Sequence, residues 1–261
     1  MVQTRGVHVE MEALIARMEG DLSRLRAARD GRRHFHATYL RTTRAVAAEI
    51  ERGDFLDNAW LVRWDVAFAQ LYLDALDADD RGDAVPQPWR CAFDTARDRA
   101  DLPPLRHVLL GMNAHINFDL PQALLAVITP AEFADPDLLA RRGSDHRHVD
   151  EVLLRQVGAE DREMGRAVRL SLLDRLLGPL NRASTRRLLV EARAKVWHNA
   201  RLLDVARRGG PERYAGLLAD LEARCAAKLA ELTAPGQVLL RLARHGFGVK
   251  LTGTPVNSSP N

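Results

Sequence analysis

The sequence has few of the features that place a chain outside the cell or in a membrane. Its only two cysteines, Cys91 and Cys225, lie far apart and fit core thiols in a reducing compartment. It contains no apolar run of about 18 residues, the length that a membrane-spanning helix needs. Residues 1–21 are charged and amphipathic, without the apolar core of a secretion signal. These absences predict a soluble cytoplasmic protein.

Lysine is also scarce, and charge of one sign does not dominate. Only three of the 38 basic residues are lysine, and 35 acidic residues are interspersed with them, for a formal net charge of +3. The sequence lacks the basic blocks and the arginine-aromatic alternation that are typical of a nucleic-acid surface. We therefore interpret the charges as a solvated helix surface, and no nucleic-acid partner is supported.

Several familiar catalytic motifs are missing. There is no Gly-rich phosphate loop after a strand, no G-x-S-x-G elbow, no Cys-x-x-Cys and no H-E-x-x-H. The Glu-x-x-His pairs of ferritin-like di-iron proteins are absent too. The aspartate-rich motif of diphosphate-binding helices is absent as well. Residues 76–80 resemble it most, but we expect them to form a loop at a helix end. Any site must therefore be argued from other residues.

Helical periodicity is present in almost every part of the chain, and no convincing strand run occurs. Prolines at 86, 88, 103 and 104 and glycines at 209–210 mark breaks between helices. The pattern predicts helices over 8–28, 32–52 and 58–77, a shorter one from 85–89, a long apolar one after 101–104, short turns over 129–145, and helices over 145–178, 184–208 and 211–232. We predict an all-α protein with one bundle domain of about eight to ten helices over 1–250, and a disordered tail over 251–261.

The apolar segment 109–125 carries polar residues that need an explanation. His115 and Asp119 are four residues apart, so they share one helix face, which the neighbouring apolar residues mark as inward. Asn117 points about 200° away, where it can satisfy a backbone group or a neighbouring helix. Pro121 lacks an N–H and is expected to kink the helix just beyond Asp119. A buried His-x-x-x-Asp pair at a kink predicts a catalytic or metal site, with a satisfied polar core as the alternative.

A second pair with the same spacing, His146 and Asp150, lies within residues 143–154. Two such pairs on facing helices would supply four ligands to one divalent ion, and imidazole and carboxylate together suit zinc, iron or manganese. The expected metal ligands are His115, Asp119, His146 and Asp150. The alternative is ordinary cap chemistry, because Ser144 or Asp145 can begin a helix here.

An aspartate on the helix over 58–76 lies among aromatic residues. Asp65 is expected near the core, as a catalytic residue, a further metal ligand, or the acceptor that orients a ligating histidine. A salt bridge to one of the many arginines is the alternative. The expected pocket residues are Trp64, Phe68, Tyr72, Asn117, Trp197 and His198; for the last two, a purely structural role stays open.

Four stretches within residues 30–210 together resemble a bacterial all-helical family that is catalogued as a domain of unknown function. They are "WDVAFAQLY", "LLGMNAHINFDLPQAL", "DHRHVDEVL" and "VWHNARLL", and the Asn-Ala-His-Ile-Asn-x-Asp-Leu-Pro part is specific. The family has no assigned reaction, so the resemblance implies the helical fold and the choice of site residues. The family often has Asn at the position of Asp150, which leaves His115, Asp119 and His146 as the firmer ligands.

The stretch "HINFDLPQAL" is also similar in style to the sites of zinc-dependent phospholipases C and single-strand nucleases. Those helical enzymes use a His-x-x-x-Asp pair followed by a Pro-containing turn, so the likeness implies phosphodiester hydrolysis by a metal-activated water. The chain departs from them because it has no secretion signal, no ligating N-terminal tryptophan and too few histidines for a three-metal cluster.

Three function hypotheses follow. The first is a metal-dependent enzyme, with zinc or iron as its cofactor, that hydrolyses an ester or phosphoester of a small-molecule substrate; oxygen activation by non-haem iron is its main variant. The second is a metal-free cyclase or isomerase that acts on an apolar metabolite, with His115 and Asp119 as an acid/base pair. The third is a non-enzymatic helical module that binds a partner or a ligand. The sequence does not set the oligomeric state.

Overall fold

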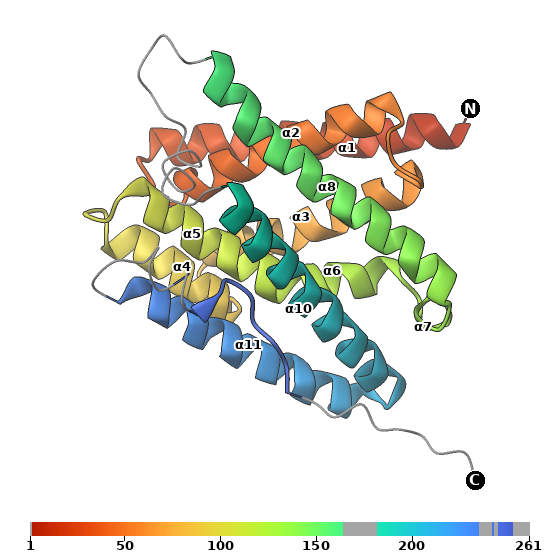
Figure 1. Ribbon diagram of the computed structural model, residues 1–261. Helices are drawn as coiled ribbons and strands as arrows, with labels where there is room; N and C mark the ends of the chain where they lie inside the picture. The colour runs from red at the N-terminus through yellow and green to blue at the C-terminus, as the bar shows by residue number, and fades with distance from the viewer. Residues whose placement is uncertain (1, 164–181, 235–241, 243–244, 253–261) are drawn as a thin grey trace.

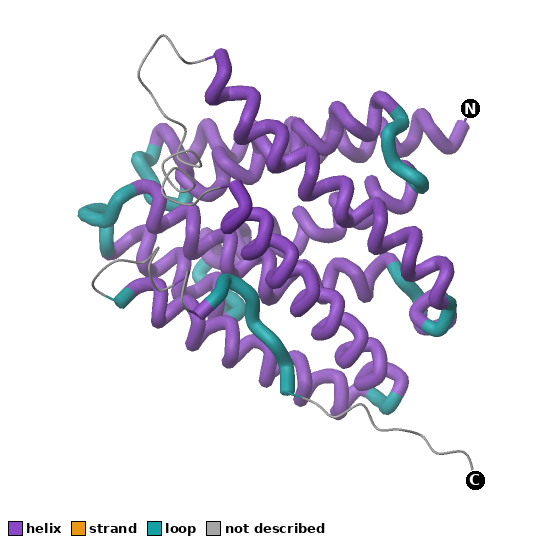
Figure 2. The backbone as a smooth tube through the Cα atoms, viewed as in Figure 1, coloured by secondary structure: helices purple, strands orange, loops and turns teal. Residues whose placement is uncertain are grey.

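The computed structural model describes residues 2–163, 182–234, 242 and 245–252 of the chain (Figure 1). The regular elements in these ranges are all helices, and no strand occurs among them (Figure 2). The all-α prediction is confirmed. The helices are α1 (Val2–Ala27), α2 (Arg33–Arg52), α3 (Asn58–Arg81), α4 (Gln87–Asp98), α5 (Pro104–Ala114), the π-helix η1 (His115–Asp119), α6 (Leu120–Val127), α7 (Pro130–Phe133), α8 (Pro136–Glu163), α10 (Arg182–Arg208) and α11 (Pro211–Thr233).

Local signals in the sequence set the ends of the central helix α3. Asp57 caps its N-terminus, because the carboxylate accepts a hydrogen bond of 2.9 Å from the backbone N–H of Trp60. Gly82 ends the helix with a φ of 74°, a left-handed conformation that glycine adopts without steric cost. Gly53 ends α2 in the same way. The two glycines therefore account for the sharp turns after both helices.

Helix α8 begins earlier than the sequence analysis expected. Asp135 precedes it, and its carboxylate accepts hydrogen bonds of 3.0 Å from the backbone N–H groups of Asp137 and Leu138. Pro136 then occupies the first helical position, where its missing N–H costs nothing. Asp145 lies inside the helix instead of capping it, and accepts hydrogen bonds from the N–H groups of Leu56 and Asp57. The predicted start at 145 is wrong, and the predicted extension to 178 lies partly outside the described residues.

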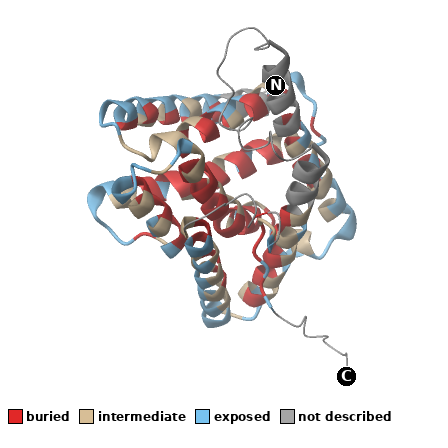
Figure 3. Cartoon of the chain, turned by 60° about the vertical axis from the view of Figure 1, so that its left-hand side comes forward, coloured by how far each residue is buried: buried red, intermediate tan, exposed pale blue. Residues whose placement is uncertain are grey.

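The core lies where α3 meets the continuous rod formed by α5, η1 and α6. Helix α3 packs against α1, α2, α6 and η1, while α10 and α11 cover the other side of the rod. Figure 3 shows the buried residues gathered on these inner helices, with exposed residues on the outer faces. Trp60, Leu61, Val62 and Leu73 of α3 are fully buried. The rod that carries His115 and Asp119 is therefore enclosed by helices on several sides.

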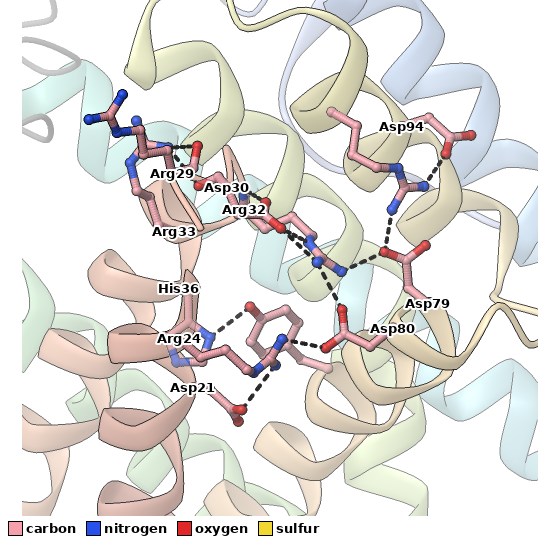
Figure 4. Close-up of polar contacts among 12 residues, drawn as sticks. Asp21, Arg24, Arg29, Asp30, Arg32, Arg33, His36, Asp79, Asp80 and Asp94 are labelled. Carbon is pink, nitrogen blue, oxygen red and sulfur yellow. Dashed lines mark hydrogen bonds and ion pairs between the residues drawn. The ribbon is translucent and has the colours of Figure 1, made fainter. Parts of the chain in front are cut away.

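A group of ion pairs joins α1, the α1–α2 turn, α3 and α4 at the outer surface (Figure 4). The guanidinium of Arg32 lies 2.7 Å from Asp30, 2.6 Å from Asp79 and 2.8 Å from Asp80. The Arg32 network consists of Arg24, Arg32, Arg97, Asp30, Asp79 and Asp80. The aspartates expected in a loop at 76–80 are thus part of the last turns of α3, and all three bind arginine.

Near the C-terminus, residues 245–252 leave a helical turn at His245 and then run as an extended chain along α10 and α11 (Figures 1 and 2). We call these residues the C-terminal segment. Leu251 in it is buried, although it falls within the predicted disordered tail. That boundary is therefore corrected for residues 251 and 252, and the remainder of the predicted tail lies outside the described residues.

Candidate functional site

The helix changes its winding between His115 and Asp119. The backbone N–H of Leu120 bonds to the carbonyl of His115, five residues earlier, so His115–Asp119 form one π-helical turn. Pro121 has no N–H to continue the ordinary helical pattern, and the π turn directly precedes it. Single π turns occur often at functional sites.

A buried row of hydrogen bonds fixes the imidazole of His115. Nδ1 of His115 lies 2.8 Å from Oδ2 of Asp119, and the same oxygen accepts a hydrogen bond of 2.9 Å from Nε1–H of Trp89. His115 is 3% exposed and Asp119 is 1% exposed. His115 and Asp119 share the proton between Nδ1 and Oδ2; when Asp119 is ionised, Nδ1–H of His115 donates to it, which leaves the lone pair of the neutral ring on Nε2.

Burial sets the protonation of this pair. It lowers the pKa of His115 well below its ordinary value and raises the pKa of Asp119 well above its own, the second effect being opposed by the hydrogen bond from Trp89. The two groups share a proton, so they titrate as one unit. A low-dielectric site disfavours the net negative form of that unit, which strengthens it as a proton acceptor. Nε2 is the atom through which the pair gains or loses a proton.

Aromatic rings surround the imidazole. Phe68 stacks on His115 with ring centroids 3.6 Å apart and planes 4° apart, and Tyr39 meets it edge-on at 4.5 Å. Tyr72 lies 6.0 Å away. The structure therefore places two predicted pocket residues, Phe68 and Tyr72, beside His115. Sequence reasoning did not connect Tyr39 with His115, because the two belong to helices far apart in the chain.

Three buried polar atoms in this region have no hydrogen-bond partner in the described structure: Nε2 of His115, Oη of Tyr39 and Oδ2 of Asp65. The pKa of Tyr39 is raised well above its ordinary value, first by burial and then by the charges of Asp65 and Asp119, which together outweigh the lowering effect of the neighbouring Thr43 side chain. Burial alone raises the pKa of Asp65 to about 7. We call Tyr39, Asp65, His115 and Asp119 the His115 cluster.

The predicted four-ligand metal site is not formed. His146 contacts Trp64 at a centroid distance of 5.1 Å, and Trp64 stacks at 5.9 Å on Phe68, the ring that covers His115. The two imidazoles thus lie at different positions along a row of aromatic rings. Within the described ranges, no group of three or more His, Cys, Asp or Glu side chains is arranged to hold a metal ion. The assignment of His115, Asp119, His146 and Asp150 as ligands of one ion is corrected accordingly.

The other predicted site residues fall into two places. Trp197 contacts His146, with ring centroids 5.8 Å apart. Asn117 and His198 bond to the C-terminal segment, so neither lines a pocket around His115. Asp65 makes no ion pair with an arginine or lysine in the described part of the chain, so the alternative of a salt bridge is also wrong there.

Comparison with known families gives a match over most of the chain. A model of the family of unknown function DUF5995 matches residues 11–235. The chain belongs to this family. The predicted membership of a family of unknown function is therefore confirmed. The comparisons do not show the likeness to phospholipases C and nucleases, since no curated protein and no solved structure matches the chain.

The sequence predicts no membrane-spanning helix. None of the described helices is both long and apolar enough to cross a bilayer.

Proposed function

We propose that this protein is an isomerase or cyclase in which His115 and Asp119 act as a general acid/base pair on a small apolar molecule. The observation that carries the proposal is the unpartnered Nε2 of His115, buried among aromatic rings and backed by Asp119. A polar atom buried without a partner costs free energy, which a bound ligand or water would recover. The metal-dependent hydrolase is not proposed, because its ligands do not converge.

Each member of the His115 cluster has a role in this proposal. Nε2 of His115 removes a proton from the substrate, and Asp119 stabilises the imidazolium that forms. The raised pKa of Tyr39 keeps its hydroxyl protonated, so it donates a hydrogen bond to a substrate oxygen as negative charge develops there. Asp65, with a pKa near 7, exchanges protons at neutral pH and serves as a second acid or base.

The burial of the cluster limits what the substrate is and how it arrives. Stacked and edge-on rings offer an apolar surface, which favours a substrate with few polar groups. Tyr39 and Asp65 are no more exposed than 6%, so a substrate reaches them only when the packing opens locally. We therefore expect opening of the site, instead of proton transfer, to limit turnover.

Isomerisation of 3-cyclohexenone, a small apolar β,γ-unsaturated ketone, tests the proposal. A base removes a proton from the carbon between the carbonyl and the double bond, the double bond moves into conjugation, and the proton returns at the far carbon. The product is detected by its ultraviolet absorbance. We expect His115→Gln and Asp119→Asn each to lower kcat/KM at least ~100-fold. His198→Gln, the matched control, should stay within about twofold of the wild type.

The same assay separates the proposal from the metal hypotheses. Activity that survives exhaustive chelation, and disappears in His115→Gln, supports acid/base chemistry by the pair. Activity lost on chelation and restored by zinc or iron would contradict it. A wild-type protein that neither converts the ketone nor shifts the ¹⁵N signal of Nε2 when the ketone is added would count against a ligand site here.

A further inference from the structure

The C-terminal segment is held by side-chain amides that bind its backbone. Asn117, in η1, donates from Nδ2 to the carbonyl of Phe247 at 3.1 Å and accepts at Oδ1 from the N–H of Val249 at 2.8 Å. Asn199, in α10, donates to the carbonyl of Val249 at 2.9 Å and accepts from the N–H of Leu251 at 2.9 Å. Each asparagine thus binds the carbonyl of one residue and the N–H of the residue two positions later.

This pattern matches that of a parallel β-sheet. There, one residue of a strand donates to a carbonyl of its neighbour and accepts from the N–H two residues further on. Asn117 and Asn199 repeat that pairing at successive steps of two residues, so together they replace the edge of a neighbouring strand. Both asparagines are 1% exposed or less. Two buried side-chain amides whose hydrogen bonds are all made to one peptide backbone form a specific binding site for that backbone.

Further side chains from α5 and α10 complete the contacts with the backbone. Nδ2 of Asn113 binds the carbonyl of Phe247 at 3.1 Å, and Nζ of Lys195 binds the carbonyl of Gly248 at 3.0 Å. His198 lies 3.2 Å from the carbonyl of Leu251 through Nε2. These contacts recognise an extended main chain and do not depend on its side chains.

The side chains of the segment supply the specificity. Val249 and Leu251 are buried at alternating positions, while Lys250 between them is exposed. A β-carbon at Gly248 would lie 3.1 Å from Cα of Ala192 and 2.7 Å from a side-chain carbon of Lys195, so a larger residue requires the backbone of α10 to shift and Lys195 to move aside, which favours glycine at this position. The site therefore selects the pattern Gly-apolar-x-apolar.

We propose that α5, η1 and α10 form a binding groove for an extended peptide of this pattern, and that the same segment of a second copy of the chain is a competent occupant. The described hydrogen bonds that hold residues 247–251 come from α5, η1 and α10 to the segment itself, so none of them requires the segment to belong to the same chain. The chain's own segment competes with that of a second copy for the groove, and it has a high effective concentration because it is covalently attached. Exchange between copies requires that it first leave the groove. This inference does not depend on the proposed function.

Peptide binding to a full-length variant with an emptied groove tests the proposal. The double substitution Val249→Asp and Leu251→Asp should expel the resident segment, because two carboxylates would be buried without partners. A fluorescent peptide with the sequence of residues 245–252 should bind this variant at least about tenfold more tightly than it binds the wild type, in which the groove is filled. Equal binding to the two proteins would overturn the proposal.

Matched peptides test the pattern. The peptide with Gly248→Ala should bind the emptied variant at least about tenfold more weakly, because its β-carbon meets the backbone of α10. The peptide with Lys250→Ala should bind within about twofold of the original, because Lys250 faces solvent. Adding Asn117→Ala or Asn199→Ala to the emptied variant should also weaken binding. A Gly248→Ala peptide that binds as well as the original would contradict the groove.

Hydrogen exchange in the otherwise unaltered chain provides a test that stands even if the double variant fails to fold. The amides of Val249 and Leu251 donate to Asn117 and Asn199 respectively, so both should exchange slowly in the wild type. Asn117→Ala should accelerate exchange at Val249 more than at Leu251, and Asn199→Ala should do the reverse, each by at least about tenfold. Exchange of both amides at the rate of an unstructured peptide in the wild type would overturn the proposal.

Discussion

The Arg32 network and the His115 cluster are two groups of partly or fully buried polar side chains. They differ in how many of their polar atoms have a partner. In the network, the guanidinium of Arg32 binds three aspartates, and Arg24 and Arg97 bind two of these again. In the cluster, the only hydrogen bond between members joins His115 to Asp119 among the described contacts, and three polar atoms lack partners. The charged groups of the network pair with one another, whereas the cluster contains polar atoms that could still form hydrogen bonds.

This difference separates a structural role from a functional one. Opposite charges that satisfy one another stabilise the junction of α1, α3 and α4 and leave nothing to bind a ligand. Unpartnered atoms in a buried site reduce stability, and natural proteins retain such a cost mainly at functional sites. Substitutions in the network should therefore lower stability more than substitutions in the cluster.

The largest effect is expected at the centre of the network. Arg32→Ala leaves Asp30 partly buried without its arginine partner and leaves Asp79 with Arg97 alone, and should lower the free energy of unfolding by about 3 kcal/mol. Arg44→Ala is the matched control, because the Arg44–Glu19 pair is about half exposed and should contribute no more than about 0.5 kcal/mol. Urea denaturation of both variants measures the difference. Equal losses would show that the network does not stabilise the junction.

A smaller effect, with a characteristic pH dependence, is expected at Asp65. Its pKa is raised to about 7 in the folded protein from 3.8, so the folded state keeps a proton that the unfolded state releases. The stability that Asp65 provides is present at low pH and is lost as the pH rises toward 7. Asp65→Asn cannot titrate, so its stability relative to the wild type should increase by about 2 kcal/mol between pH 5 and pH 7.

The control for this prediction is a second substitution at the same position. Asp65→Leu also removes the titrating group, so its stability relative to the wild type should change with pH by the same amount as that of Asp65→Asn, whatever the offset between them. Thermal denaturation at several pH values provides the data. Curves for the wild type and Asp65→Asn that run parallel across this range would show that Asp65 is ionised throughout.

Local sequence signals predicted most of the fold. Apolar residues spaced three and four apart gave α2 and α11 to within one residue at each end, since the pattern and the breaks agree. The start of α8 was missed because Gly143, Ser144 and Asp145 resemble a helix start, while the true signal is Asp135 followed by Pro136. A helix passes through Gly143 because the packing of its neighbours outweighs the weak helix propensity of one glycine.

The candidate site was predicted only where it depends on one helix. The spacing of His115 and Asp119 brought them together, and it does so whether the turn between them is α or π. The contact of His115 with Tyr39 and Phe68 depends on how α2, α3 and η1 pack, which no single helix encodes. The same limit explains the incorrect metal site, because equal spacing in two helices does not show that the pairs face each other.

The smallest effect is expected from a comparison of two buried tyrosines, of which Tyr72 has a hydrogen-bond partner for its hydroxyl and Tyr39 has none in the described structure. Tyr72 donates to Nδ1 of His36 at 2.9 Å, and Nε2–H of His36 donates to the carbonyl of Met18, so Tyr72→Phe should cost about 1 kcal/mol by leaving Nδ1 without a partner. Tyr39→Phe removes a hydroxyl that has no partner among the described residues, so it should change stability by less than about 0.5 kcal/mol. Urea denaturation of the two variants at one pH distinguishes the positions. If Tyr39→Phe costs as much as Tyr72→Phe, the hydroxyl of Tyr39 has a hydrogen-bond partner in the resting protein, and the contrast between the His115 cluster and the Arg32 network fails at this residue.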